Sequence, residues 1–262
     1  MIGFEYEKIN SENENEITQR TLLGVEFPEL EKKFDGSDKE YLKDLSELYL
    51  NLLDKVMEKS ANRETCKEWL LSTDFFQAPS STKYHSAFIG GLLYHSLLVT
   101  ECLIKKCETQ VWGQYFEENN ISLEKLIFIA MTHDLCKINF YNIDYKNQKV
   151  YSETGSKYDE RGKFDWKTVP VFTINEELPL GHSEKSIYLI EHHFFRLPED
   201  MALAIRGHMG FSLEGEVNLF QNIVRKCPLA LALSEADQEA SMLFEYRENP
   251  NTEKIKRGNS YE

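Results

Sequence analysis

Apolar residues recur at helical spacing along much of the chain. The clearest series advances in steps of three and four residues, through Tyr41, Leu45, Leu48, Leu52 and Val56. This spacing predicts an amphipathic helix that begins after Ser37 and runs to about Lys59, and a second, shorter helix is expected over 62–72. The segment 84–107 is rich in leucine and contains no proline, which predicts another helix.

Local signals mark where several helices begin. Ser122 is a good N-cap for a helix that reaches about Lys137. Helices are also expected over about 183–195 and 198–208, and Pro228 suits the first turn of a last helix that runs to about 246. The pair Gly90–Gly91 lies inside the leucine-rich segment and costs a helix roughly 1 kcal/mol per glycine, so we expect another backbone segment to approach it closely.

Two parts of the chain depart from the helical pattern. The stretch 139–180 mixes aromatic, β-branched and charged residues and alternates roughly over 167–173, which predicts a small β-hairpin-like excursion. Residues 1 to about 37 are polar and acidic and are expected to form a loosely ordered arm. We therefore predict a mainly α fold in three parts: an acidic N-terminal arm with helices over 1–80, a main domain over 81–248 and a polar tail over 249–262.

Charge and cysteine content narrow the class of protein. The formal net charge is −14, and residues 1–80 hold 18 acidic and 10 basic residues. Such a chain repels long nucleic acid, so a small anionic substrate is expected. No segment is long and apolar enough to span a membrane, no apolar signal segment opens the chain, and five cysteines without a CxxC pair suit a reducing compartment. We expect a cytoplasmic protein, and we do not expect a cysteine-ligated zinc site.

Histidine and aspartate residues lie where a metal would explain them. His133 and Asp134 are adjacent at the end of an apolar helix, and Asp237 lies within another apolar helix. A carboxylate buried in such surroundings is costly unless a cation compensates it. Imidazole and carboxylate ligands suit zinc, manganese, iron, nickel or cobalt. The sequence therefore predicts a transition-metal site.

Five segments in order resemble the HD superfamily of metal-dependent phosphohydrolases. They are YHSAFIGGLLYHS (84–96), THDLCK (132–137), GHSEKS (181–186), IRGHMG (205–210) and EADQEA (235–240). The first resembles the opening motif of the HD domain in bacterial 3′–5′ exoribonucleases. The second resembles the family's HDxGK, with Cys136 where glycine is usual. The resemblance covers about 84–245 and implies an HD-type helical bundle.

The resemblance also implies roles for individual residues. Metal ligands would be His95, His133, Asp134, His182, His208 and Asp237. Asp134 would bridge two ions and take part in catalysis. Binuclear members often carry two consecutive histidines where this chain has His208-Met209, so one ion and two ions both remain open. The reaction would be the attack of a metal-activated water on a phosphoester or phosphodiester of a nucleotide or nucleotide-like substrate.

Other polar residues near these motifs are candidate substrate groups. Lys137 would bind the substrate phosphate as a catalytic cation, Lys185 and Arg206 would clamp it, and Glu184 would accept a hydrogen bond from a ligand histidine. His85 would line the mouth of the pocket, because ten helical residues place it roughly 15 Å from His95.

Some residues are given structural roles, and others remain open between packing and substrate contact. His193 lies eleven residues after His182, too far along a helix to share its ion, so His192 and His193 are interpreted as one buried and one exposed structural histidine. The 139–180 excursion is expected to cap the site. Its aromatic residues either stack on a base or pack the excursion: Tyr141, Tyr145, Phe164 and Trp166.

Three other functions remain open. The first motif suggests exonuclease-like activity on short nucleic acid, although the acidic charge argues against it. Some HD-fold enzymes use the same ligands for diiron oxygenation. A non-catalytic nucleotide-binding module is the third alternative. The oligomeric state and the metal are not determined by the sequence.

Overall fold

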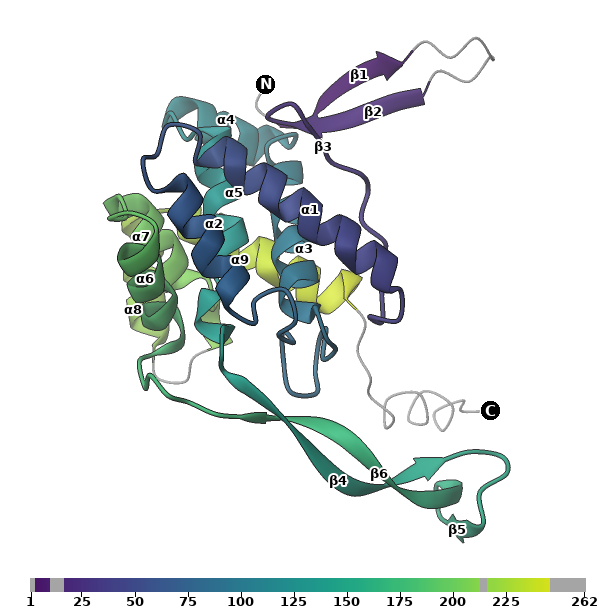
Figure 1. The fold of residues 1–262 in the computed structure, drawn as a ribbon. Helices are drawn as coiled ribbons and strands as arrows, with labels where there is room; N and C mark the ends of the chain where they lie inside the picture. The colour runs from purple at the N-terminus through teal and green to yellow at the C-terminus, as the bar shows by residue number, and fades with distance from the viewer. Residues whose placement is uncertain (1–2, 10–16, 213–215, 246–262) are drawn as a thin grey trace, which may run out of the picture.

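The computed structural model describes residues 3–9, 17–212 and 216–245. It is mainly helical, with two small antiparallel sheets (Figure 1). The helices are α1 (Lys39–Val56), α2 (Arg63–Ser72), α3 (Gly91–Lys106), α4 (Gln110–Glu118), α5 (Leu123–Thr132), α6 (His182–His193), α7 (Glu199–Gly207), α8 (Val217–Lys226) and α9 (Leu229–Glu239), with the short helical turns η1 (Leu135–Lys137), η2 (Gly210–Ser212) and η3 (Ala240–Phe244). The strands are β1 (Glu5–Ile9), β2 (Ile17–Leu22), β3 (Val25–Glu26), β4 (Tyr141–Tyr151), β5 (Lys157–Asp159) and β6 (Gly162–Ile174).

The helical body is built around α3. Most residues of this helix are buried, because α1, α5 and α9 all pack against it. The helices at 39–56, 63–72, 182–193 and 199–207 were predicted from their spacing and caps, and Ser122 caps α5 by accepting a hydrogen bond from the amide of Lys125. An HD-type arrangement of these helices stays a prediction.

The N-terminal segment differs from the expected arm. Its described residues form a three-stranded sheet in the order β1-β2-β3, whereas residues 1 to about 37 were expected to be a loosely ordered arm ahead of the N-terminal helices. Apolar side chains anchor this segment, because Leu22, Phe27 and Leu30 are almost fully buried in the same core cluster as α3 and α9. The residues on either side of position 80 therefore share one hydrophobic core.

The glycine pair begins a helix and does not lie inside one. Gly90 has φ of 87° and precedes α3, which starts at Gly91. A Cβ atom on Gly91 would lie 2.0 Å from the carbonyl oxygen of Ser86, so the expected close backbone approach exists. The residues before the helix fold back over its first turn, which places His85 near His95.

The predicted hairpin is present and projects away from the helical body (Figure 1). Strands β4 and β6 pair from Tyr141–Ile174 to Tyr151–Phe164 without interruption, and β5 adds a short third strand at the tip. Only the base of this hairpin lies beside the helices. The excursion therefore does not cap the helical body along its length, because its paired strands form a self-contained ribbon.

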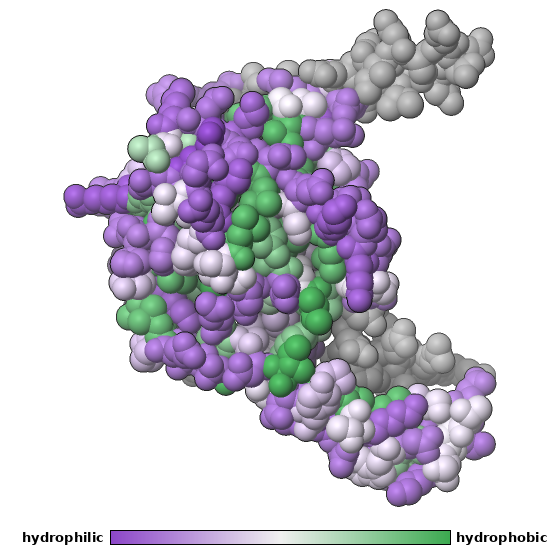
Figure 2. Space-filling view, viewed as in Figure 1, coloured by the Kyte–Doolittle hydropathy of each residue, from purple (hydrophilic) through white to green (hydrophobic). Residues whose placement is uncertain are grey.

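The described helices include none with the length and apolarity of a membrane span. The face shown in Figure 2 is mainly hydrophilic, with an apolar strip along the middle of the helical body. The polar tail expected over 249–262 lies outside the described residues, as does the end of the last predicted helix at 246.

Candidate metal centre

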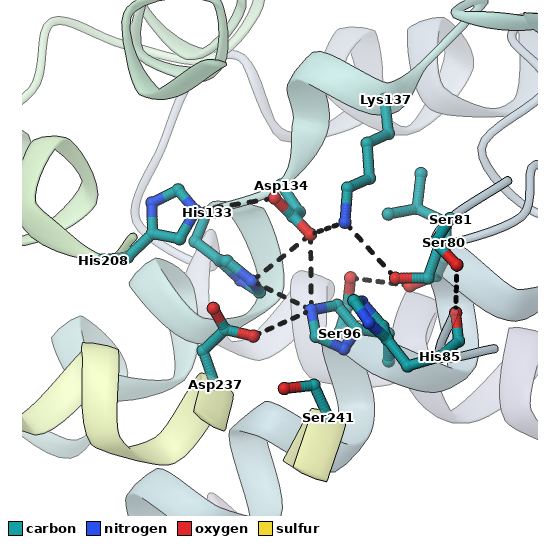
Figure 3. Close-up of polar contacts among 12 residues, drawn as sticks. Ser80, Ser81, His85, Ser96, His133, Asp134, Lys137, His208, Asp237 and Ser241 are labelled. Atoms are coloured by element: carbon teal, nitrogen blue, oxygen red, sulfur yellow. Dashed lines mark hydrogen bonds and ion pairs between the residues drawn. The ribbon is translucent and has the colours of Figure 1, made fainter. Parts of the chain in front are cut away.

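Six polar residues meet in the helical body, and Figure 3 shows His133, Asp134, His208 and Asp237 among them. His95 lies on α3, Asp237 on α9, and His182 begins α6. The others follow helix ends: His133 after α5, Asp134 before η1 and His208 after α7. The side chains of His95, His133, Asp134 and His208 are at most 3% exposed, whereas those of Asp237 and His182 are 18% and 27% exposed. The two more exposed residues mark the side from which the cluster is reached.

One oxygen of Asp134 faces a first group of ligand atoms. Its Oδ2 lies 3.3 Å from Nε2 of His95 and 3.6 Å from Nε2 of His133. The two imidazole nitrogens are 3.2 Å apart, and Nε2 of His95 lies 3.4 Å from Oδ1 of Asp237. Ligands about 2.1 Å from one cation are separated by about 3.4 Å in a tetrahedral site, so these pairs of atoms have the spacing of ligands to a single ion.

The other oxygen of Asp134 faces a second group. Its Oδ1 lies 2.7 Å from Nε2 of His182 and 3.6 Å from Nε2 of His208. The Sγ atom of Cys136 lies 4.0 Å from the same oxygen. Asp134 thus presents one oxygen to each group, as a carboxylate that bridges two ions does.

The ring orientation of two histidines is fixed by helix-end carbonyls. Nδ1 of His133 lies 2.8 Å from the carbonyl oxygen of Ala130, and Nδ1 of His208 lies 2.6 Å from that of Ile205. A carbonyl only accepts, so each Nδ1 must donate. The last carbonyls of a helix lack a partner within the helix, and a histidine just past the end can bond the carbonyl three residues back. Both rings are therefore held with Nε2 toward the cluster.

His95 is oriented by a buried carboxylate. Its Nδ1 donates to Oε1 of Glu245 at 2.6 Å, and Glu245 is 2% exposed. Burial lowers the pKa of His95, but the carboxylates of Glu245, Asp134 and Asp237 outweigh it and raise that pKa to about 10. Nε2 of His95 is then protonated and faces the carboxylates of Asp134 and Asp237. A metal cation bound by these two carboxylates would replace that proton.

The pKa shifts of the other ionisable groups indicate which of them are charged when no metal is bound. Burial and neighbouring histidines lower the pKa of His133, and burial lowers that of His182, so both rings are neutral. Burial alone would raise the pKa of Asp134, but Lys137 and His133 hold it well below its usual value. Burial raises the pKa of Asp237. The carboxylates of Asp134 and Asp237, together with the neutral imidazoles of His133 and His182, form a set that a divalent cation would stabilise.

An unpartnered nitrogen supports this assignment. Nε2 of His208 is buried and has no hydrogen-bond partner among the described residues. Buried polar atoms of this kind are rare and are costly unless something binds them. The neutral nitrogens, the carboxylates and this orphaned atom all fit a metal ion.

Lys137 lies against the cluster. Its Nζ is 2.5 Å from Oδ2 of Asp134 and 3.3 Å from the hydroxyl oxygen of Ser80. Tyr141, at the base of the hairpin, donates to the carbonyl of Ser80 at 3.4 Å. Burial lowers the pKa of Lys137, but the charge of Asp134 outweighs burial and raises it. A permanent positive charge therefore lies beside the ligands.

His85 is much closer to His95 than its position in the sequence suggested. The two ring centroids are 5.2 Å apart, because α3 begins only at Gly91 and the preceding residues fold back. The estimate of roughly 15 Å, which assumed a continuous helix, is wrong. Burial lowers the pKa of His85 to about 3, so the ring is neutral. His85, His95 and Glu245 together form a further group with ligand spacing.

Three residues expected near the substrate form ion pairs of their own. They are Lys185, Arg206 and Glu184. Lys185 lies 2.8 Å from Glu176. Arg206 lies 2.6 Å from Glu184 and 2.9 Å from Glu216. Glu184 therefore bonds Arg206 where a ligand histidine was expected, because their side chains meet at adjacent helix ends.

The other histidines and the hairpin aromatics lie apart from the cluster. His193 stacks on Trp69 with centroids 3.9 Å apart, and His192 stacks on Tyr188. His192 is exposed and His193 is half-buried, so the expected fully buried member is absent from the pair. Tyr145 and Trp166 are exposed on the hairpin, and Phe164 is buried within its tip. The three hairpin side chains do not line the cluster.

Two residues of the centre were missed from the sequence. Glu245 falls near the end of the last predicted helix, and only its position after Asp237 on that helix could have indicated a role. Cys136 was noted as a departure from the motif, but its thiol was not expected beside a ligand. Its Sγ lies 3.3 Å from Nδ1 and 3.5 Å from Nε2 of His182.

Comparison of the chain with protein-family models, with curated proteins and with solved structures found no match.

Proposed function

We propose that this chain is a two-metal phosphohydrolase of the HD type, acting on a small phosphorylated substrate. One observation carries the proposal. Buried histidines direct Nε2 atoms at the two sides of Asp134, and their opposite ring nitrogens are held by Ala130, Ile205 and Glu245. The order of these residues along the chain supports the HD assignment, because it agrees with the motif order of that family.

The residues divide into two candidate ligand groups. His95, His133, Asp237 and Oδ2 of Asp134 would hold one ion. His182, His208 and Oδ1 of Asp134 would hold the other. Bound ions would lower the pKa of a coordinated water and neutralise charge on phosphoryl oxygens.

Lys137 and Ser80 would bind the substrate's phosphoryl group. The ammonium of Lys137 keeps its proton, so it can donate to phosphoryl oxygens and stabilise the charge that develops on them. Its hydrogen bond to Ser80 orients it on the side of Asp134 opposite the second group.

A small substrate suits the charge of the molecule. The net charge is −14, which repels a long polyanion. Lys185 and Arg206, the other expected phosphate contacts, are paired with glutamates. The cluster therefore lacks the row of free cations that a nucleic-acid strand would need, among the residues described.

The test is hydrolysis by protein loaded with manganese, iron or zinc. We expect phosphate or nucleotide release from mononucleotides or cyclic dinucleotides, and slower cleavage of short RNA. Asp134→Asn should lower turnover by at least about 100-fold, and Lys137→Met by roughly 100-fold. Asp144→Asn, on the exposed hairpin, is the matched control and should keep full activity.

Two results would overturn the proposal. One is metal-loaded protein that hydrolyses none of these substrates. The other is oxygen consumption by the iron-loaded protein in the presence of an organic substrate, which would instead indicate an oxygenase.

A further inference from the structure

Cys136 occupies an unusual place in the candidate centre. It lies in η1, two residues after Asp134 and one before Lys137, and is 3% exposed. The other four cysteines are buried among apolar residues or bonded to backbone carbonyls, and within the described part of the chain only Cys136 joins a group with ligand spacing. That group is Asp134, Cys136 and His182.

The distances from Sγ of Cys136 to Nε2 of His182 and to Oδ1 of Asp134 fit a thiolate ligand. For zinc, bond lengths of about 2.3 Å to sulfur and about 2.0–2.1 Å to nitrogen separate the two ligand atoms by about 3.6 Å in a tetrahedral site. Sγ of Cys136 lies 3.5 Å from Nε2 of His182 and 4.0 Å from Oδ1 of Asp134. The backbone amide of Cys136 donates to Ser186 at 3.0 Å, which fixes the position from which the side chain extends.

A fourth candidate ligand faces the same carboxylate oxygen. Nε2 of His208, buried and without a hydrogen-bond partner, lies 3.6 Å from the same Oδ1. Two imidazole nitrogens, one carboxylate oxygen and one sulfur make a four-ligand set of the kind that tetrahedral zinc uses.

We propose that Cys136 is a ligand of the second metal ion, so that this ion is held by Asp134, Cys136, His182 and His208. This inference rests on the proposed metal centre. On binding, the thiol proton passes to solvent and the sulfur forms the bond to the ion. A thiolate favours zinc, cobalt or iron over manganese, so the two halves of the centre differ in metal preference.

The direct test is X-ray absorption on zinc-loaded wild-type protein. We expect a sulfur shell at about 2.3 Å beside a nitrogen and oxygen shell at about 2.0–2.1 Å. Cobalt-loaded protein should also show a thiolate-to-cobalt charge-transfer band. Neither measurement on the wild type depends on the folding of a variant.

Variants of Cys136 test whether the sulfur signal comes from this residue. Cys136→Ser and Cys136→Ala should abolish the charge-transfer band and weaken binding of the second zinc ion by at least about tenfold, with a smaller effect on manganese. Cys66→Ser is the matched control, because its buried thiol donates to the carbonyl of His193 outside the cluster, and it should keep the band.

The outcomes separate this inference from the proposed function. Two bound ions without a sulfur shell would overturn the thiolate ligand and leave the metal centre intact. A sulfur signal that persists in the Cys136 variants would also overturn it. A wild-type protein that binds no ion would overturn both.

Discussion

Each inner histidine of the centre is held through the ring nitrogen that faces away from it. His133 and His208 use the carbonyl three residues back, whereas His95 uses Glu245. Such outer partners set the tautomer and make the facing nitrogen a better ligand. The negative charge of Glu245 also partly neutralises the charge of a bound cation. A backbone carbonyl, which has only a dipole, does so less strongly.

Replacing Glu245 should therefore weaken metal binding. We expect Glu245→Gln to lower metal affinity by about tenfold and Glu245→Ala by up to about 100-fold. Competition with a chelating dye measures the affinity. Glu239→Gln is the control, since Glu239 pairs with Lys106. Equal affinities in wild type and Glu245→Gln would show that Glu245 only packs the helix end.

At the same scale, the sequence indicates ligands but not their neighbours. His133-Asp134 and Asp237 were identified because a charged residue in an apolar helix is costly to bury unless a partner compensates it. Glu245 carries no such signal, since it precedes a polar segment. The position of His85 was misjudged because the start of α3 was placed before Gly90.

At the scale of elements, the N-terminal sheet is tied to α3 by a buried carboxylate. Glu101 on α3 is fully buried and lies 3.2 Å from Arg20, 2.7 Å from Lys32 and 2.8 Å from Lys105. Burial would raise its pKa, but Lys105 and Lys32 outweigh burial and lower it. The network joins β2, the segment between β3 and α1, and α3.

Glu101→Gln should destabilise the fold by about 3 kcal/mol at about pH 7, the lower end for breaking a buried ion pair, because the cations can still reach water. A group with a lowered pKa contributes fully above its unfolded pKa of about 4.3 and loses this contribution as the pH falls through its folded value. The variant should therefore approach the wild type in acid.

Urea unfolding across that pH range measures the difference. Lys43, whose ion pairs with Glu40 and Glu47 are exposed, provides the control: Lys43→Gln should change stability by less than about 1 kcal/mol. A constant difference between Glu101→Gln and wild type at all pH values would contradict the assignment.

Element prediction succeeded where one pattern dominates. Helix α1 has a clear apolar stripe, and the hairpin has strand-forming residues over both arms. The N-terminal strands were missed because their polar composition resembles a disordered arm, and only Leu22 and Phe27 hint at burial. Strands β1 and β2 are consecutive in the sequence and pair with each other, but their residues do not show the regular apolar and polar alternation that predicts a strand.

At the scale of the whole molecule, the fold separates a buried cluster from a projecting hairpin. The centre lies where α3, α9 and the ends of α5 and α7 meet, so it depends on most of the helical body. The hairpin of β4 and β6 touches this body only at its base (Figure 1). Convergence of residues scattered from His95 to Asp237 was predicted through the resemblance to a family, because spacing alone does not place distant helices.

The most direct measurement is a crystal structure of metal-loaded protein with anomalous scattering recorded at the metal edge. We predict two peaks about 3.5–4 Å apart, one on each side of the Asp134 carboxylate. A map with no peak within reach of Asp134, or with a single peak at full loading, would contradict the two-metal centre.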